Sequence, residues 1–504
     1  MAGLARHVDP DGLMKKLSDS PGQRHRACTN QAISHSTPYS SRYASASELS
    51  KFRIPHDGAP AEAVHQLVKD ELDLDGSPNL NLSSFVGTYM EHEAEQLLME
   101  NISKNMADAD EYPAMTNIHA RCISILVHLW GVQKGETAIG SDTTGSLEAV
   151  HLGGLAMKRR WQEKRDAEGK DKSKPNIIMG ANAQVTLEKF ARYFEVEARL
   201  LPVSAESHYQ LDPDLVRDKI DKNTIGVFVI LGFTYTGHFK PVEEISKILD
   251  AYEKRTGVDI PIHVDAASGG FIAPFTHAKA GGSKWNIELP RIIWRDESYL
   301  PKHLIFELHY PGGTEQSYTL NFSRPGAHVI AQYFNLIHLG FTGYRIIMEN
   351  ALANARLLSR SLETTGWYEC ISDIHRKKGD HNYVKGREQY EGSTSADYNA
   401  ALPVVTFYLS KDFRRKCPHV KQVSINNLLR ARQYIVPSYA LPPNEDKTEI
   451  LRDETVMDTD LTDILAWQPG TVSIEKEQAS AGEQHKNRHK TKHPMSKGIH
   501  RSVY

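Results

Sequence analysis

The sequence predicts an α/β protein with a mainly parallel sheet that helices cover on both faces, followed by a smaller α+β region. Short apolar runs such as "KPNIIMGA", "NTIGVFVILG" and "IPIHVDAASGG" alternate with segments that carry apolar residues at helical spacing. Continuous apolar runs of this length are typical of strands that are buried on both faces. Strands that alternate with helices along a chain favour a parallel sheet.

The elements follow in order along the first part of the chain. Residues 85–106, "FVGTYMEHEAEQLLMENISKNM", have helical spacing, and residues 174–181 form a short strand that opens after a proline. Residues 189–203, "KFARYFEVEARLLPV", pass from a helix into a strand, and residues 223–237 and 260–270 are two further strands. Ligands of such sheets bind at the carboxyl ends of the strands, so we expect the polar residues after "VFVILG" and "IHV" at that edge.

The second part of the chain has a different pattern. Residues 346–366 predict a long helix, and residues 402–410 and 434–443 predict strands of a smaller domain. We therefore expect an N-terminal arm (1–80), a large cofactor-binding domain (81–345), a small C-terminal domain (346–470) and a disordered basic tail (471–504).

Composition excludes several classes of function. The 504 residues carry a formal net charge of −3, which favours neither nucleic acid nor a membrane surface as a partner. We find no apolar run long enough to span a bilayer and no apolar secretory signal at the N-terminus. Four scattered cysteines without a CxxC pair predict no zinc site and no disulfide framework, and they favour a reducing, cytoplasmic compartment.

Two motifs indicate chemistry. In "HVDAASGG" an aspartate, Asp265, ends a buried apolar strand, which is costly unless the carboxylate has a partner. That partner is either a set of backbone amides or a cation on a ligand. In "IGSDTTGSLEAVHLGG" a Gly/Ser turn precedes a helix, and it serves either as a plain helix cap or as a phosphate site on helix N-terminal amides.

Together with "SKNMADADEYP", "KFARYFEVE", "HVDAASGGFIAPF" and "LNFSRPGAHVIAQYF", these motifs make the chain resemble the group II pyridoxal-phosphate decarboxylases, specifically the glutamate decarboxylase family. The resemblance runs from about Tyr39 to Trp467. It implies the fold of fold type I enzymes and pyridoxal 5′-phosphate as cofactor. It also implies conversion of L-glutamate to 4-aminobutanoate and carbon dioxide, and a homodimer or larger homo-oligomer.

The resemblance also implies roles for individual residues. Six would bind the cofactor: Asp265 at the pyridine nitrogen, Ala267 and Gln184 on the two faces of the ring, Thr234 through a hydrogen bond, Ser146 at the phosphate, and Ser323 at the phosphate of the partner subunit. Four would bind glutamate: Ser84, Phe85 and Asn105 at the distal carboxylate, and Arg452 at the α-carboxylate. The guanidinium of an arginine suits the last role because it binds a carboxylate through two parallel hydrogen bonds.

The chain departs from the family where the catalytic lysine should stand. In the family a strand ends in Ser-x-His-Lys between "LPR" and "WRDE", but here Arg291 is followed directly by Ile292. About twenty residues are missing, roughly two strands and their turn. The remaining lysines nearby, Lys279, Lys284 and Lys302, lack the Ser-x-His-Lys context. We therefore expect no catalytic residue and no turnover in this chain.

A second departure lies in the phosphate turn, where the family has Gly-Ser-Ser-Glu and this chain has "GSLE". Leu147 therefore removes one hydroxyl donor. The short segment after Arg452 is a third departure, and it leaves the placement of that arginine open.

Three hypotheses remain open on the sequence. The gene specifies a working glutamate decarboxylase and this chain is a partial reading of it, or the chain is non-catalytic and pairs with an intact subunit, or a related enzyme acts on another amino acid. The "NLSSF" and "SKN" segments argue against the third hypothesis. The Lys/His-rich residues 485–501 have almost no large apolar anchors, so we expect no calmodulin binding.

Overall fold

The computed structural model describes residues 53–56, 58–83, 90–183, 185–239, 241–277, 287–288, 291–310, 313–385, 388–442 and 445–453. The chain forms two compact units, one of Met1–Gly76 with Ala481–Tyr504 and the other of Ser77–Ser480. The first unit contains helix α3 (Ala61–Leu72), which begins directly after Pro60. Among the helices within the described ranges, none is long and apolar enough to cross a membrane.

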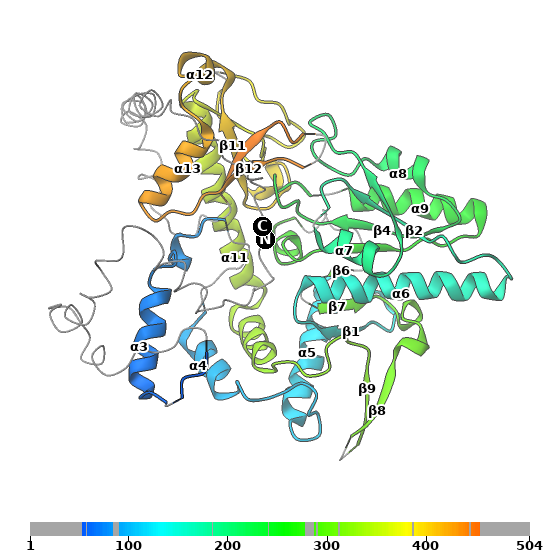
Figure 1. Cartoon of the computed structure of the whole chain (residues 1–504). Coiled ribbons are helices and arrows are strands. Elements are labelled where there is room, and N and C mark those ends of the chain that lie inside the picture. Colours follow the sequence, from blue (N-terminus) through cyan, green and yellow to red (C-terminus); the bar gives the residue numbers. More distant parts are fainter. Residues whose placement is uncertain are drawn as a thin grey trace, which may run out of the picture. The chain divides into compact units, whose positions relative to one another are not determined.

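The second unit is built on a five-stranded parallel sheet with the strand order β3-β2-β4-β5-β6 (Figure 1). Its strands are β2 (Asn176–Gly180), β3 (Glu197–Leu201), β4 (Thr224–Ile230), β5 (Ile262–Asp265) and β6 (Ile287–Glu288). Every residue of β2 and β4 is buried, which explains why these strands have continuous apolar sequences. The predicted parallel sheet is thus confirmed.

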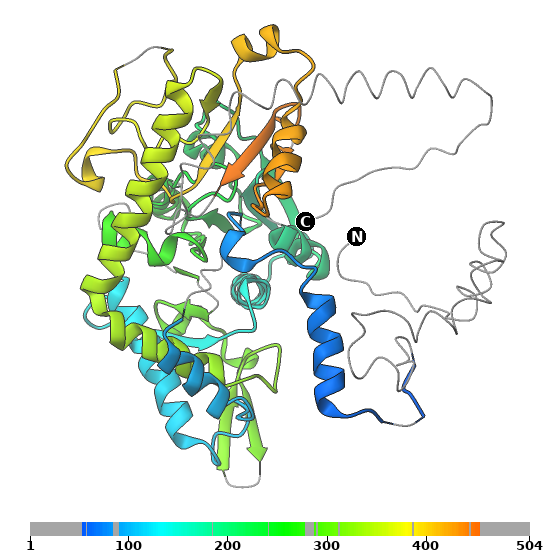
Figure 2. The ribbon, with the colours of Figure 1, turned by 90° about the vertical axis from the view of Figure 1, so that its left-hand side faces the viewer.

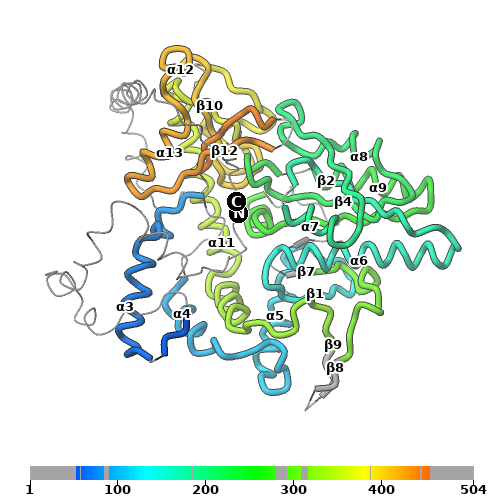
Figure 3. The backbone as a smooth tube through the Cα atoms, in the orientation of Figure 1, coloured from blue at the N-terminus to red at the C-terminus, as the bar shows by residue number. Residues whose placement is uncertain are grey.

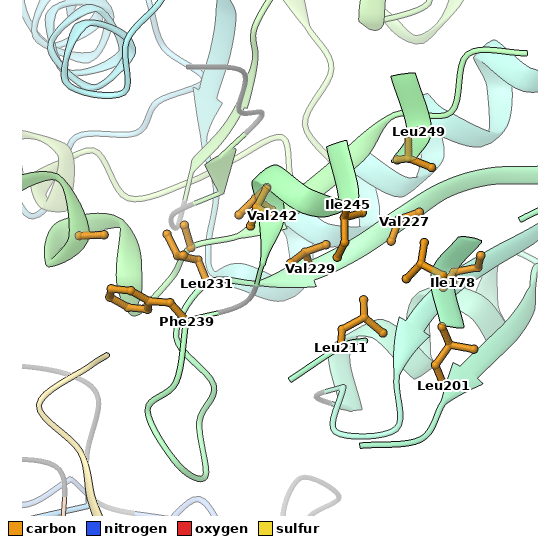
Figure 4. Packing of buried hydrophobic residues seen from close by; sticks show 14 of the residues in the cluster. Ile178, Leu201, Leu211, Val227, Val229, Leu231, Phe239, Val242, Ile245 and Leu249 are labelled. Carbon is orange, nitrogen blue, oxygen red and sulfur yellow. The ribbon is translucent and has the colours of Figure 1, made fainter. Parts of the chain in front are cut away.

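Helices cover both faces of this sheet, as the sequence predicts. Helices α8 (Pro213–Lys219) and α9 (Val242–Thr256) lie on one face, and α6 (Ser146–Ala167) and α7 (Val185–Tyr193) lie on the other (Figure 1). The side chains of β4 alternate between the two. Val227 and Val229 face Ile245 and Leu249 of α9 (Figure 4), whereas Phe228 packs against the α7 side.

A second group of elements lies beside the sheet. Strands β1 (Ile139–Asp142) and β7 (Arg291–Trp294) form an antiparallel pair that packs on α6. Helices α4 (His92–Glu100) and α5 (Pro113–Leu129) pack against the long helix α11 (Ala327–Thr364), which bends at Gly340 (Figures 2 and 3). A hairpin of β8 (Phe306–Tyr310) and β9 (Gly313–Ser317) extends away from these elements.

The C-terminal part forms a four-stranded antiparallel sheet with the order β10-β11-β13-β12. Its strands are β10 (Tyr368–Cys370), β11 (Val405–Leu409), β12 (Ser438–Ala440) and β13 (Glu449–Asp453), joined by helices α12 (Lys411–Lys416) and α13 (Gln422–Ala431). The strands predicted within 402–410 and 434–443 are confirmed as β11 and β12. The long helix predicted at 346–366 is the C-terminal half of α11, which begins much earlier.

Candidate active site

Two predicted cofactor residues lie at the carboxyl edge of the parallel sheet. Asp265 is the last residue of β5 and is paired in register with Ile230, the last residue of β4. The backbone N–H of Leu231 donates to the carbonyl of Asp265 over 2.7 Å, so the chain is held at the start of the loop that leads to Thr234. Parallel pairing therefore brings the ends of the two strands together, as expected.

The carboxyl group of Asp265 is buried, and few protein groups around it stabilise its charged form. Burial raises its pKa, although the backbone N–H of Ala267 donates to Oδ1 over 3.1 Å and offsets part of that rise. Within the described residues, no basic side chain forms an ion pair with it. The next turn leaves Ala267 exposed, whereas Ala266 is fully buried. A buried carboxylate beside an exposed methyl group fits a flat ring that carries a protonated nitrogen.

Ser146 begins the 22-residue helix α6, four residues after β1 ends. The turn before it is held by the buried carboxylate of Glu148, which accepts from the backbone N–H of Thr144 over 2.8 Å and from its hydroxyl over 3.0 Å. The same carboxylate accepts from the backbone N–H of Asn321 over 3.0 Å. Glu148 thus joins the N-terminus of α6, where an anion is favoured, to the loop that carries Ser323.

Asn105 and Ser323 meet in this region although 218 residues separate them in sequence, with 3.4 Å between Asn105 Nδ2 and Ser323 Oγ. Asn105 Oδ1 accepts from the backbone N–H groups of Ala107 over 3.2 Å and of Arg324 over 2.9 Å. Because the oxygen is engaged by the backbone, the amide is oriented with its NH₂ group toward Ser323. That orientation presents a donor, which is what a carboxylate requires.

Arg452 lies on β13, where it pairs with Thr406 of β11. It is only 4% exposed, and its Nη1 donates to the carbonyl of Ser83 over 3.3 Å. The C-terminal sheet therefore places this arginine beside the segment that precedes Ser84. The short sequence after Arg452 does not prevent a regular strand up to Asp453. The predicted residues Ser84, Phe85 and Gln184 lie outside the described residues.

Sequence reasoning missed an ion pair that supports this region. Arg324 contacts both carboxylate oxygens of Asp142, with 3.0 Å from Nη2 to Oδ1 and 3.3 Å from Nε to Oδ2. The two side chains are only 9% and 10% exposed. The pair ties the end of β1 to the loop of Ser323. The only signal for it in the sequence is the position of the two residues, one just before the phosphate turn and the other within "NFSRP".

The parallel sheet ends at β6, close to the junction of Arg291 and Ile292. Strand β6 pairs with β5 at only two positions, Val264 and Asp265, and β7 pairs with β1. Beside the start of β5 lies a small cavity of about 20 Å³, lined by α6, β5 and β7. His263 borders this cavity, and burial lowers its pKa to about 3, so the ring is neutral.

Of the remaining lysines nearby, one lies within the described residues. Lys302 is exposed in a short 3₁₀ turn, Lys302–Leu304, which follows β7. Lys279 and Lys284 lie outside the described residues.

Comparisons with known proteins agree with this geometry. Residues 61–378 match the model of the pyridoxal-dependent decarboxylase conserved domain, and the chain belongs to that family of pyridoxal 5′-phosphate enzymes. It is similar, more particularly, to glutamate decarboxylases. It is 45% identical over 438 residues to that of Saccharomyces cerevisiae, covering 80% of this chain and 75% of the yeast protein. It is 40% identical over 474 residues to glutamate decarboxylase 1 of Arabidopsis thaliana, covering 90% of this chain and 87% of the Arabidopsis protein.

Solved structures extend the likeness to the fold. The glutamate decarboxylase of Lactobacillus brevis superposes with a TM-score of 0.72 at 30% identity, covering 88% of this chain and 98% of that protein. The tryptophan decarboxylase of Catharanthus roseus superposes with a TM-score of 0.61 at 13% identity, covering 95% of this chain and 100% of that protein. At that identity the likeness supports the fold alone. The prediction of a fold type I architecture is confirmed.

The described residues fit the cofactor. Asp265 offers a buried carboxyl group at the end of β5, and the N-terminus of α6 offers backbone donors at Ser146. The lysine that binds the cofactor covalently in the family has no counterpart here, because Arg291 is followed directly by Ile292.

Proposed function

We propose that this chain has the cofactor pocket and substrate pocket of an L-glutamate decarboxylase, the enzyme that forms 4-aminobutanoate and carbon dioxide. The observation that carries the proposal is its 35–45% identity over most of its length to glutamate decarboxylases of yeast, plants and a bacterium. Likeness to a decarboxylase of an aromatic amino acid is limited to the fold, at 13% identity. Glutamate is therefore favoured over another amino acid as the substrate.

Pyridoxal phosphate, when bound, supplies the electron sink for the carbanion that decarboxylation leaves behind. In our proposal Asp265 holds the proton on the ring nitrogen, because a buried carboxylate without a protein cation stabilises a positive partner. Ala267 and Gln184 contact the two faces of the ring, Thr234 donates a hydrogen bond, and Ser146 binds the phosphate. These roles follow the family positions.

The substrate would be held at its two carboxylates. Asn105 is oriented as a donor by its backbone contacts, so we place it with Ser84 and Phe85 at the distal carboxylate. Arg452 would bind the α-carboxylate, and its buried position on β13 supports a fixed direction for that group. Holding both ends of the substrate selects an acidic side chain of the length of glutamate.

The missing lysine limits what the chain can do as it stands. A desolvated lysine is the nucleophile that binds and releases the cofactor carbonyl in this chemistry, and no residue of the chain matches its motif. We propose that this chain binds the cofactor non-covalently and does not turn over glutamate. A transcript that restores the segment between Arg291 and Ile292 would encode the active enzyme.

The test compares three proteins for release of carbon dioxide from L-glutamate in the presence of pyridoxal phosphate. They are the 504-residue chain, the same chain with the yeast relative's segment inserted between Arg291 and Ile292, and that insertion with its lysine replaced by alanine. We expect activity only in the second protein. Turnover by the 504-residue chain would contradict the proposal, and turnover of an aromatic amino acid by the second would overturn the choice of glutamate.

A second candidate function is a non-catalytic subunit that pairs with an intact one. The observation in its favour is that the loop carrying Ser323 keeps its supports, Glu148 and Asn105, although the lysine segment is gone. In this proposal Ser323 would reach the phosphate site of the partner. Co-expression with a lysine-restored chain tests this candidate. A non-catalytic subunit would co-purify with the lysine-restored chain in a fixed ratio, whereas a chain without this role would not.

We also propose that the chain forms a homodimer or larger homo-oligomer in the cytoplasm. Exposed apolar side chains on α11 and next to Ser323, including Ile337, Leu320 and Phe322, support an interface. The four cysteines are few and scattered and include no CxxC pair, which supports a reducing compartment.

A further inference from the structure

A cluster of two histidines and one aspartate lies outside the site described above. His238 follows β4, Asp373 follows β10, and His381 lies in the loop after it. His238 Nε2 is 3.1 Å from Asp373 Oδ1, and His381 Nδ1 is 2.5 Å from Asp373 Oδ2. One ligand atom from each of the three residues lies within 4.8 Å of the other two.

The aspartate at the centre is almost inaccessible to water. The side chain of Asp373 is 1% exposed and that of His238 is 5% exposed, whereas His381 reaches the surface at 27%. Both carboxylate oxygens of Asp373 therefore face a histidine nitrogen inside the fold.

Contacts behind the cluster fix two of its members. His238 Nδ1 lies 2.7 Å from the hydroxyl of Thr236, a contact that orients the ring with Nε2 toward Asp373. The backbone carbonyl of Asp373 accepts from the N–H of Arg376 over 2.9 Å. In metal sites, a histidine ligand is usually oriented through its other nitrogen in this way.

A third histidine, His208, packs against His381. The ring of His208 lies 4.1 Å from the ring of His381, between centroids. His208 and Tyr209 both have left-handed backbone conformations, with φ of 48° and 55°, which cost free energy for residues other than glycine. The carbonyl of Tyr209 accepts from Asn182 Nδ2 over 3.0 Å, so the turn is held in place. Strain of this kind is typical of side chains that are held for a purpose.

We propose that His238, Asp373 and His381 bind a zinc-class divalent cation. Imidazole nitrogens with one carboxylate form the donor set that suits Zn²⁺, whereas Mg²⁺ and Ca²⁺ prefer oxygen ligands alone. Zinc binds such atoms at about 2.0–2.2 Å in a tetrahedral arrangement.

A cation bound at this position would connect the loop after β4 to the C-terminal part of the chain. The segment before His238 contains Thr234, and it is bound to the C-terminal part by Leu402, whose N–H donates to the carbonyl of Gly237 over 2.9 Å. The hydroxyl of Ser372 donates to the carbonyl of Thr236 over 3.0 Å. A cation shared by His238, Asp373 and His381 would reinforce this connection and restrict the loop that carries Thr234.

The test is a calorimetric titration of the full chain with Zn²⁺, followed by Co²⁺ substitution to record the absorption bands of the bound ion. We expect one tight equivalent per chain and a tetrahedral Co²⁺ spectrum with nitrogen and oxygen ligands. The variants His381→Ala and Asp373→Asn should each weaken the tight site at least tenfold, because each removes one ligand. His381 is partly exposed, so its variant should keep the fold, which circular dichroism checks.

The histidine-rich tail supplies the control. A variant with His485, His489 and His493 replaced by alanine removes an adventitious site and should leave the tight equivalent unchanged. Equal zinc affinity in the original chain and in His381→Ala, loss of the tight site with the tail histidines, or absence of a tight site would overturn the proposal. Each would indicate that the cluster is a hydrogen-bonded ion-pair network. The readout does not depend on pyridoxal phosphate, so it stands apart from the proposed activity.

Discussion

At the scale of single residues, Asp265 shows how a functional group costs stability. The side chain lies at the end of a buried strand and accepts one backbone hydrogen bond, from Ala267. Burial raises its pKa in the folded chain above that in the unfolded chain. The ionised form therefore destabilises the cofactor-free fold at neutral pH, and a protonated ring nitrogen would remove that cost.

We expect Asp265→Asn to have opposite effects on folding and on binding. Without cofactor, the variant should be more stable at pH 7, on the order of 1 kcal/mol, because an amide does not carry the buried charge. That gain should shrink as the pH falls toward about 4, where the carboxyl of the unfolded chain takes up its proton. Affinity for pyridoxal phosphate should fall at least tenfold.

Urea denaturation at pH 7 and pH 4 measures the first effect, and equilibrium dialysis of the cofactor measures the second. Asp218→Asn on α8 is the control, because this side chain is exposed, and it should change neither quantity. A variant that loses stability at pH 7 would show that Asp265 has a stabilising partner in the protein itself.

The ion pair of Arg324 and Asp142 predicts a large effect of a different kind. Arg324→Ala leaves a nearly buried carboxylate without its main cation, and we expect a loss of about 3 kcal/mol in the free energy of unfolding. Arg192→Ala is the matched control, because its ion pair with Glu188 is mostly exposed. That variant should lose far less, as exposed pairs contribute little. Equal losses in the two variants by urea denaturation would argue against a supporting role for the buried pair.

At the scale of elements, helix α6 is the structural centre of the site. It packs on the parallel sheet and on the β1–β7 pair, and its first turn carries Ser146. Its close approach depends on Gly153 and Gly154, which face His263 and Phe190. The small cavity bordered by β5 and β7 lies along the same helix. We therefore expect the restored lysine segment to stabilise the fold as well as to supply the nucleophile.

We expect Gly154→Ala to destabilise the protein by about 1–3 kcal/mol, because the added methyl group would overlap the fully buried ring of Phe190. Gly343→Ala on α11 is the control. There the nearest atom to an added methyl group is Leu339 Cβ at 3.2 Å, and helix propensity favours alanine. Thermal unfolding followed by circular dichroism compares them. If Gly154→Ala matched the control, the helix would have room that the packing does not indicate.

At the scale of the whole molecule, the exposed apolar residues of α11 and of the Ser323 loop predict self-association. Ile337 is 59% exposed on α11. Ile337→Glu should shift the protein toward the monomer in analytical ultracentrifugation, because a charge would be buried at the interface. Val423→Glu on α13 is the matched control, with an exposure of 45%, and should leave the association state unchanged. A monomeric original chain would remove the basis for a partner role of Ser323.

Local sequence determined much of this protein. The buried runs of β2, β4 and β5 and the helical spacing between them were sufficient to predict a parallel sheet, because burial on both faces leaves a signal within a few residues. The end of β5 located Asp265, and the direct junction of Arg291 and Ile292 revealed the missing lysine.

Only the tertiary structure decided which distant residues meet. Asn105 reaches Ser323 across 218 residues, Asp142 reaches Arg324 across 182, and Arg452 reaches Ser83 across 369. The cluster of His238, Asp373 and His381 also draws on separate elements. Local patterns specify which face of a helix or strand is buried, whereas such pairings depend on how the chain packs as a whole. No motif in the chain encodes them.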